Sequence, residues 1–455
     1  MLDQRPKQGN IFETPILDFA DRQHPLIKLA GEINWSSLDE AFAEVYSWKM
    51  GAPAKSVRLM VGLHFLKHMN DMSDDVVVEK WVENPYWQYF CGEEYFKTKC
   101  PIHPTTMTKW RNRLKNKHLE QLLEETISAG LQMKVITPKS FDRVNVDTTV
   151  MEKNIGFPTD AKLLYRAIEH LNRFARAQGL RLKQTFERVG KERLLMVQRY
   201  AHSRKMNKAR KELRKLRSYV RQLLSMILRQ ISGKAARSFA PIKQLVEKLL
   251  GQNRSSKNKV YSLHEPEVEC ISKGKAHRKY EFGCKVGFVS TSKEGFILSA
   301  KAFHGNPYDG HTLGNNLMQA EGIVGSRGTI KAVFVDRGYR GHDYAGNAAV
   351  HIVKNISRQT PTLKKWMKRR SVIEGDIGFM KHETRLNRNY LKGTRGDEIN
   401  AMFAAIGKNL RMLLRELSFL PFLTSLAQVT CFISAFLGSL RSSDPDQSNF
   451  AFYEN

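Results

Sequence analysis

Apolar residues recur at three- and four-residue steps through most of residues 36–135. In "KSVRLMVGLHFLKHM" they include Val57, Met60 and Val61, a spacing that predicts a helix. The stretch "HPTTMTKWRNRLKNKHLEQLLEE" begins near a proline and two threonines, residue types that are common where a helix starts. We therefore expect an all-α N-terminal domain over residues 1–135.

The pattern changes to strict alternation at "DRVNVDTTV", residues 142–150. Alternation with a period of two residues predicts a half-buried strand. Later stretches with strand character are flanked and followed by helical patterns, and they lie at residues 280–291, 296–305, 330–336 and 351–355. This order predicts an α/β domain with a mixed sheet flanked by helices, formed by residues 136–157 and 259–416.

Residues 158–258 separate the first of these strands from the others and have a helical pattern of their own. Their central stretch, from Arg193 to Ile231, is strongly basic and contains neither proline nor glycine. Apolar side chains recur along it at three- and four-residue steps, at Leu213, Leu216, Val220, Leu223, Leu224 and Ile227. We expect a basic helical insertion. Its lysines and arginines outnumber its acidic residues by too many for all of them to form ordinary Glu–Lys pairs. This excess of positive charge favours contacts with phosphates. A solvated charged face and a basic amphipathic membrane helix are the alternatives.

The overall charge points to a polyanionic partner. Lys and Arg total 74 against 45 Asp and Glu, which gives a formal net charge of +29. Nucleic acid is the leading partner because binding it releases counterions, and an anionic membrane surface is the second. The five cysteines have no CxxC spacing, which fits a reducing cytoplasm and offers neither a disulfide framework nor a zinc site. The N-terminus lacks the pattern of a secretory signal.

Residues 417–455 form a C-terminal apolar segment and tail. Within them, "FLPFLTSLAQVTCFISAFLGSL", residues 419–440, is long and apolar enough to resemble a membrane-spanning helix. It also contains a proline, a glutamine and several hydroxyl residues. We therefore expect a packing or dimerisation segment rather than a membrane span.

Basic side chains follow the expected helix start at Pro104. Lys109, Arg111 and Arg113 lie on a short helix that begins with hydroxyl residues, an arrangement that suits the DNA-reading helix of a helix-turn-helix. A basic solvated helix would have the same spacing. The two interpretations stay open.

Three acids could form a metal site. Asp147 lies on the first strand, and Asp336 follows the apolar run "AVFV" at the end of a later one. Glu374 lies in "KKWMKRRSVIEGDIGFMKHETRL", where a continuous helix would put it on one face with Arg370 and Lys381. Two Mg²⁺ ions about 4 Å apart, held by such carboxylates, can activate a nucleophile and stabilise a leaving oxygen. The alternatives are a turn former for Asp336 and a surface ion-pair stripe for Glu374.

These motifs resemble the DDE transposases of bacterial insertion sequences, in the branch whose final motif is Y-x2-R-x3-E-x6-K. The chain satisfies R-x3-E-x6-K, with Met367 at the tyrosine position and Trp366 beside it. "VNVDTTV" and "VDRGY" resemble the contexts of the first two family acids. The blocks "KGKAHRKYEFGCKVGF", "HGNPYDGHTL" and "YLKGTRGDEINAMFAAIGKNLR" resemble further family segments. The resemblance spans about residues 40–416.

The resemblance implies a ribonuclease H-like core that binds two Mg²⁺ ions, with Mn²⁺ able to substitute, through Asp147, Asp336 and Glu374. It implies a bacterial, cytoplasmic and nucleoid-associated transposase, a homodimer or higher oligomer on double-stranded DNA. Such an enzyme cuts at terminal inverted repeats and joins the 3′ ends to target DNA by transesterification. Arg370 and Lys381 would hold phosphates. Tyr339 would stack on a base or pack in the core. A nuclease without strand transfer and a catalytically silent DNA-binding protein are the alternative functions.

Overall fold

The computed structural model describes residues 14–46, 54–253, 255–272, 279–353 and 360–442, with side chains described up to Ser418. The chain forms two compact units. One comprises residues 1–137 and 406–455, and the other comprises residues 138–405. The N-terminal domain expected over residues 1–135 ends close to the first of these boundaries.

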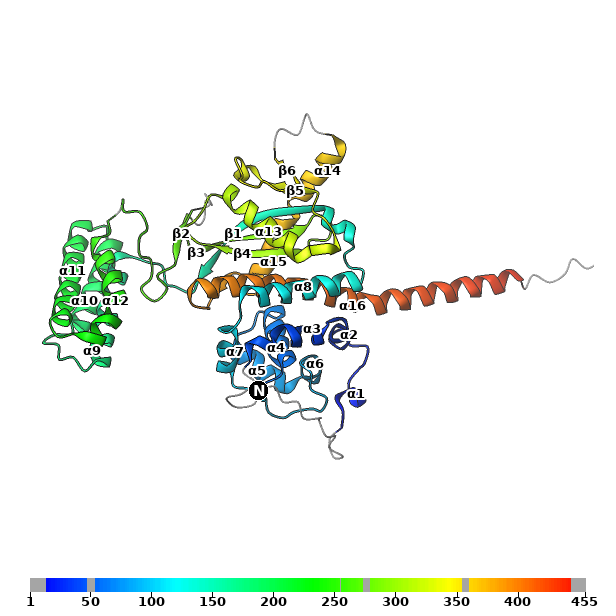
Figure 1. The fold of residues 1–455 in the computed structure, drawn as a ribbon, viewed down its shortest axis with the longest axis horizontal. Coiled ribbons are helices and arrows are strands. Elements are labelled where there is room, and N and C mark those ends of the chain that lie inside the picture. The colour runs from blue at the N-terminus through cyan, green and yellow to red at the C-terminus, as the bar shows by residue number, and fades with distance from the viewer. Residues whose placement is uncertain (1–13, 47–53, 254, 273–278, 354–359, 443–455) are drawn as a thin grey trace, which may run out of the picture. The chain divides into compact units, whose positions relative to one another are not determined.

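The N-terminal part of the first unit is built from short helices (Figure 1). They are α1 (Ile16–Phe19), α2 (Pro25–Glu32), α3 (Trp35–Phe42), η1 (Ala43–Val45), α4 (Val57–Met69), α5 (Asp74–Glu83), α6 (Pro85–Phe90), α7 (Pro104–Arg111) and α8 (Asn116–Gln132). Side-chain caps fix several of their starts: Ser56 accepts from Leu59 N before α4, and Ser73 accepts from Val76 N before α5. All but one of the residues of α4 are buried, so this helix forms the centre of the unit.

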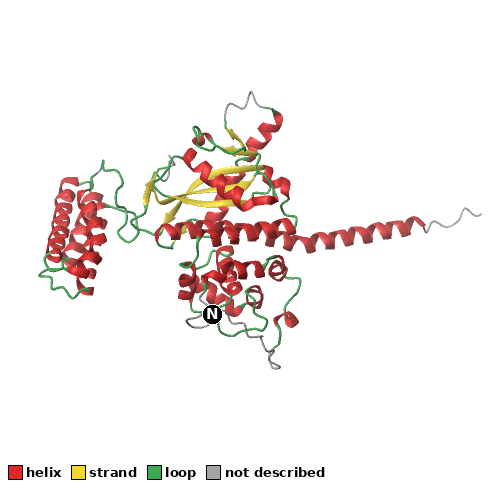
Figure 2. Ribbon diagram, viewed as in Figure 1, coloured by secondary structure: helices red, strands yellow, loops and turns green. Residues whose placement is uncertain are grey.

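The second unit contains one mixed sheet, drawn in yellow in Figure 2. Its strands are β1 (Arg143–Lys153), β2 (Glu269–Ile271), β3 (Glu281–Thr291), β4 (Ile297–Phe303), β5 (Ala332–Val335), β6 (Ala349–Ile352) and β7 (Arg388–Asn389). β1 runs antiparallel to β3 and parallel to β5, and β4 and β6 extend the sheet on either side. A strand lies at each of the five expected places; β6 begins two residues before the expected 351, and residues 354 and 355 of that prediction lie outside the described part of the chain. The mixed α/β fold, its helical N-terminal region and the sheet flanked by helices are therefore confirmed, consistent with a ribonuclease H-like core.

Helices cover both faces of this sheet. Thr148 pairs with Gly287, and a Cβ on Gly287 would meet Asn316 of α13 (Leu313–Val324), so even-numbered residues of β1 face α13. Asn145 instead donates to the carbonyl of Arg369, at the end of α14 (Pro361–Arg369), and α15 (Val372–Glu383) also packs on β1. Odd-numbered residues of β1, including Asp147, therefore face the α14–α15 side.

A network of buried charged residues connects the end of β1 to residues 389–397. Lys153 Nζ lies 3.1 Å from Asp397 Oδ1 and 3.2 Å from Glu265 Oε2, and donates to the carbonyl of Leu391 at 2.8 Å. Asp397 also accepts from Asn389 at 2.7 Å. A buried charge is costly unless it is paired, and these pairs connect the first turns of α16 (Gly393–Ser442) to the end of β1.

The insertion is a set of four helices with a core of its own. They are α9 (Asp160–Ala177), α10 (Glu187–His202), α11 (Met206–Leu228) and α12 (Gly233–Gly251). The expected apolar stripe of α11 packs into this core, where Leu216, Val220 and Ile227 are fully buried. The stretch from Arg193 to Ile231 is not one helix, because the chain turns between α10 and α11 with Arg204 in the left-handed region (φ 57°).

The C-terminal segment continues α16 as far as Ser442. The side chains of residues 419–440 lie outside the described part of the chain, so the packing or dimerisation role expected for them stays a prediction. Among the residues that the structure describes, no helix is long and apolar enough to cross a membrane.

Candidate active site and DNA-contacting residues

Two of the predicted acids lie on neighbouring strands. β1 pairs in parallel with β5 through Val144 and Val333, and through Asn145 and Phe334. Continuing this register by two residues places Asp147 opposite Asp336, directly after the end of β5. Adjacent strands are about 5 Å apart, so the two carboxylates start from neighbouring backbone positions.

Asp336 is held by the turn that follows β5. Its Oδ1 accepts a hydrogen bond of 2.9 Å from Gly338 N, at the start of η5 (Arg337–Tyr339). A Cβ on Gly338 would stand only 3.0 Å from that same oxygen, so glycine lets the carboxylate approach the backbone. The Asp336 carboxylate thus helps to form the turn that follows β5. Both interpretations of Asp336 from the sequence, turn former and acid at a strand end, apply to its geometry.

A fourth carboxylate, Asp309, lies near Asp336. It begins η3 (Asp309–Thr312), and its Oδ1 accepts from Thr148 Oγ1 at 2.8 Å and from Lys285 Nζ at 2.9 Å. Its Oδ2 would lie 3.4 Å from a Cβ on Gly338, the same point that Asp336 Oδ1 approaches. Asp309 and Asp336 therefore face one small space. In the sequence, Asp309 lies in the block "HGNPYDGHTL", which resembles a family segment. Nothing in the spacing of that block marks Asp309 as a site residue.

Tyr339 packs in the core, and the alternative of stacking on a DNA base is wrong for this conformation. The residue is fully buried. Burial is the main cause that raises the pKa of its hydroxyl well above the usual value, and the negative charges of Asp147, Asp309 and Asp336 add to it. Tyr339 thus lies in the core close to these three carboxylates, which form an acidic cluster.

Glu374 lies in the first turn of α15 with 58% of its side chain exposed. Its Oε1 accepts from Arg370 Nη2 at 2.9 Å. The continuous helix expected from 364 to 386 is wrong, because α14 ends at Arg369 and Arg370 and Ser371 form the turn before α15. The expected ion pair forms nevertheless, across this turn.

The remaining parts of the final motif lie on either side of Glu374. Lys381 is half-buried in the last turn of α15, two helical turns beyond Glu374. Trp366, beside Met367, packs on the sheet: its ring lies 6.5 Å from that of Phe334, and the Arg143 guanidinium stands 4.7 Å above it. The Trp366 ring therefore packs α14 against β1 and β5.

Carboxylate oxygens are the donors that Mg²⁺ prefers, and Asp147 and Asp336 present them from rigid neighbouring elements. The donor set fits this ion. Within the described ranges, however, no three His, Cys, Asp or Glu side chains are arranged as the ligands of one metal ion. Glu374 is engaged with Arg370. The structure thus brings two of the three predicted acids together and places the third on the helix that packs against their strand.

Of the three basic residues expected on one helix near residue 110, one is buried and two are exposed, and Arg113 lies in the turn after α7, which ends at Arg111, so its placement on the helix is wrong. Lys109 and Arg113 are exposed, as a DNA-contacting role requires. Arg111 has only 4% of its side chain exposed and forms a bidentate ion pair with Asp74, at 2.8 and 2.5 Å. The DNA-contacting role expected for Arg111 is therefore wrong in this structure, because its guanidinium is buried inside the unit and paired with Asp74.

His64 completes this buried pair. Its Nδ1 donates to the carbonyl of Met60 at 2.7 Å, which leaves Nε2 to accept from Arg111 Nη1 at 3.2 Å. Burial, followed by the charge of Arg111, lowers the pKa of His64 to about 3, so the ring is neutral at pH 7. The cluster fixes α4, α5 and α7 against one another.

Two family models that match the chain both describe transposase domains. Residues 15–113 match the family described as "Transposase domain (DUF772)", and residues 259–410 match that described as "Transposase DDE domain". Together the two matches cover more than half of the chain. The chain is also 45% identical over 206 residues to "Uncharacterized protein ORF8 in nfe locus" of Rhizobium meliloti, covering 45% of this chain and 99% of that protein. No solved structure matches.

Proposed function

Because the chain belongs to the DDE transposases of insertion sequences, we propose that Asp147, Asp336 and Glu374 are its catalytic acids. The enzyme would bind the terminal inverted repeats of its element, cut the DNA at the element ends and join the 3′ ends to target DNA. The observation that supports this proposal is the β1–β5 register, which pairs Asn145 with Phe334, two residues before Asp147 and Asp336.

The joining step is a transesterification. The freed 3′ oxygen bonds to a phosphorus of the target strand, and the bond from that phosphorus to its own 3′ oxygen breaks, so no covalent protein intermediate is needed. Mg²⁺, when bound by the carboxylates, would lower the pKa of the attacking hydroxyl and stabilise the leaving oxygen. Asp147 and Asp336 would hold it from the sheet, and Glu374 would turn from Arg370 to complete the ligand set.

The cations around the acids would then bind DNA. Release of Glu374 leaves the Arg370 guanidinium available for a phosphate, for which its planar donors are well suited. Lys381 lies further along α15 on the side of Glu374, where a second phosphate could be contacted. Two functions remain as alternatives: a nuclease that cuts without joining, and a catalytically silent DNA-binding protein.

Asp309 gives the first prediction. Its hydrogen bond fixes Thr148, the neighbour of Asp147, and its ion pair neutralises the buried Lys285. We expect Asp309→Ala to lower the rate of DNA cleavage by about 10- to 100-fold, as loss of an orienting partner does at metal sites, and to raise the Mg²⁺ concentration needed for half-maximal rate. Cleavage rates measured against Mg²⁺ concentration check this.

The exposed Asp343, a carboxylate of the same part of the chain, offers the control. Asp343→Ala should leave both the rate and the Mg²⁺ dependence unchanged. If Asp309→Ala changes neither, or only lowers thermal stability, the carboxylate has a purely structural role.

The insertion gives the second prediction. Lys205, Lys208, Arg210 and Lys211 are all exposed at the start of α11. We expect their joint replacement by glutamine to weaken DNA binding and to make its dependence on salt shallower, by about 0.9 in log–log slope for each phosphate that is no longer neutralised. Lys293→Gln, at the exposed β3–β4 turn, is the control. An unchanged slope would show that these charges are only solvated.

A further inference from the structure

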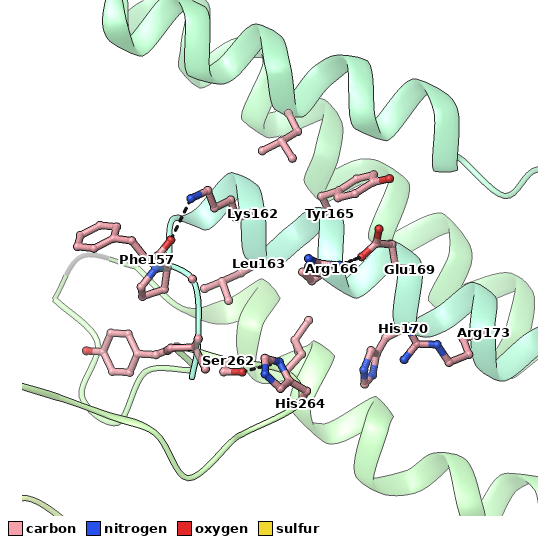
Figure 3. Close-up of a pocket in the computed structure, with 16 residues that line it drawn as sticks. Phe157, Lys162, Leu163, Tyr165, Arg166, Glu169, His170, Arg173, Ser262 and His264 are labelled. Carbon is pink, nitrogen blue, oxygen red and sulfur yellow. Dashed lines mark hydrogen bonds and ion pairs between the residues drawn. The ribbon is translucent and has the colours of Figure 1, made fainter. Parts of the chain in front are cut away.

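A cavity lies where the insertion leaves and rejoins the sheet domain. It has a volume of about 600 Å³ and is lined by residues 155–158, by one face of α9 and by residues 261–264. Figure 3 shows the side chains of Lys162, Arg166 and His264 around it. Small-molecule sites are concave spaces of this size. The cavity belongs to neither the acidic cluster nor the basic start of α11.

Three cations line the cavity along one face of α9. Lys162, Arg166 and Arg173 are spaced by four and seven residues, which keeps them on the same side of a helix. Lys162 Nζ donates to the carbonyl of Phe157 at 3.4 Å, and Arg166 Nη1 pairs with Glu169 at 2.6 Å. Glu169 is the one carboxylate of the lining. The cavity therefore has an excess of positive charge and suits an anionic ligand.

Aromatic rings form a further part of the lining. Phe157 and Tyr261 each pack on Phe282 of β3 with ring centroids 5.4 Å apart, and Tyr165 adds a ring from α9. Phe157 nevertheless keeps 61% of its surface exposed. A ring exposed to this extent can still pack against a planar ligand.

Two histidines complete the cavity with neutral polar groups. Burial, followed by nearby cations, lowers the pKa of both His170 and His264. His264 Nδ1 lies 3.0 Å from Ser262 Oγ. Neutral imidazoles can both donate and accept hydrogen bonds, and so can match the edge of a heterocyclic base.

We propose that this cavity binds one nucleotide, with its phosphate on Lys162 and Arg166, one helical turn apart on α9, and its base against Phe157 and Tyr261. Cations that follow a phosphate and rings that stack on a base are the two elements of single-strand recognition. The nucleotide would be an unpaired residue of a DNA strand or a free mononucleotide, since both present the same groups. Binding here would not depend on the catalytic acids.

Fluorescence of 2-aminopurine tests the proposal on the full chain without divalent metal. Three probes are compared: 2-aminopurine deoxyribonucleoside monophosphate, a duplex with 2-aminopurine in a short single-stranded end, and the same duplex with it base-paired. We expect stacking to quench the unpaired probe by several-fold more than the paired one. Quenching of the unpaired duplex probe alone identifies a DNA strand as the source, and quenching of the monophosphate as well identifies free nucleotide as a further ligand. Equal quenching of paired and unpaired probes, or none with any probe, overturns the proposal.

Variants locate the binding in the cavity. Phe157→Ala should abolish most of the quenching, and Phe157→Trp should retain it. Arg166→Ala should weaken binding of the unpaired probe by about 10-fold. Arg176 is the matched control, because it lies on α9 outside the cavity, is 65% exposed where Arg166 is 69% exposed, and also pairs with a glutamate. Equal effects of Arg166→Ala and Arg176→Ala, or quenching unchanged by Phe157→Ala, would contradict the assignment.

Discussion

Asp147→Asn, Asp336→Asn and Glu374→Gln should each reduce Mg²⁺-dependent cleavage of inverted-repeat DNA by about 10³-fold or more. Each change keeps the shape of the side chain and removes the charge that would hold the metal ion and thereby stabilise the charge developing on the oxygens. DNA binding should stay nearly unchanged, because the cations that contact phosphates remain. Cleavage rates and binding measured on the same preparations check both parts.

Asp376 provides the matched control for Glu374. It is the next acid on α15, but it faces the opposite way: a Cβ on Gly295, at the β3–β4 turn, would lie 2.9 Å from its carboxylate. Asp376→Asn should therefore retain cleavage. Full activity of Glu374→Gln, or an equal loss in Asp376→Asn, would remove Glu374 from the catalytic acids.

Asp74→Ala should destabilise the N-terminal unit by about 3–5 kcal/mol. Removing one partner of a buried ion pair leaves the other charge uncompensated, and Asp74 is the carboxylate that neutralises both Arg111 and Lys67, at 2.5 and 2.7 Å. Asp75→Ala, the exposed neighbour in the first turn of α5, should change stability by about 0.5 kcal/mol or less. Chemical unfolding of the full chain, followed by tryptophan fluorescence, checks the difference.

The Asp74 carboxylate should also make the stability of the N-terminal unit depend on pH. Burial alone would raise the pKa of Asp74, but the hydrogen bonds and charge of Arg111 and the charge of Lys67 outweigh burial and hold the pKa well below its usual range. A folded-state pKa below the unfolded value of about 4 means that the stabilisation is fully present above pH 4 and is lost as the pH falls further. In Asp74→Ala this acid-dependent loss should be smaller. An equal loss in both proteins would show that other groups control it.

The sheet and two of its acids could be predicted from the sequence because their signals are local. Strict alternation in residues 142–150 fixes a strand, and the apolar run before Asp336 ends at a glycine-containing turn. Parallel pairing then brings Asp147 and Asp336 together. The apolar stripe of α11 is likewise a local signal, because its residues recur at helical spacing.

The predictions from the sequence fail where the position of a side chain depends on residues far away in the chain. Arg111 has the spacing of a DNA-contacting cation, but its partner Asp74 lies 37 residues earlier in the chain. Asp309 lies 161 residues from Thr148, to which it is bonded. The helix break at Arg370 and Ser371 contains neither proline nor glycine, so no local signal marks it. Such features follow from tertiary packing, which overrides local patterns.

Strand transfer is the reaction that separates a transposase from a nuclease or a silent DNA-binding protein. Full-length protein and Mg²⁺ would be incubated with a duplex that carries the element's terminal inverted repeat and a pre-cleaved 3′ hydroxyl, together with a supercoiled target plasmid. We predict a covalent product in which that 3′ end is joined to the plasmid, no such product from a 3′-deoxy end, and none with Asp336→Asn. A plasmid that is cut but never joined, or joining that persists in Asp336→Asn, would contradict the proposed function.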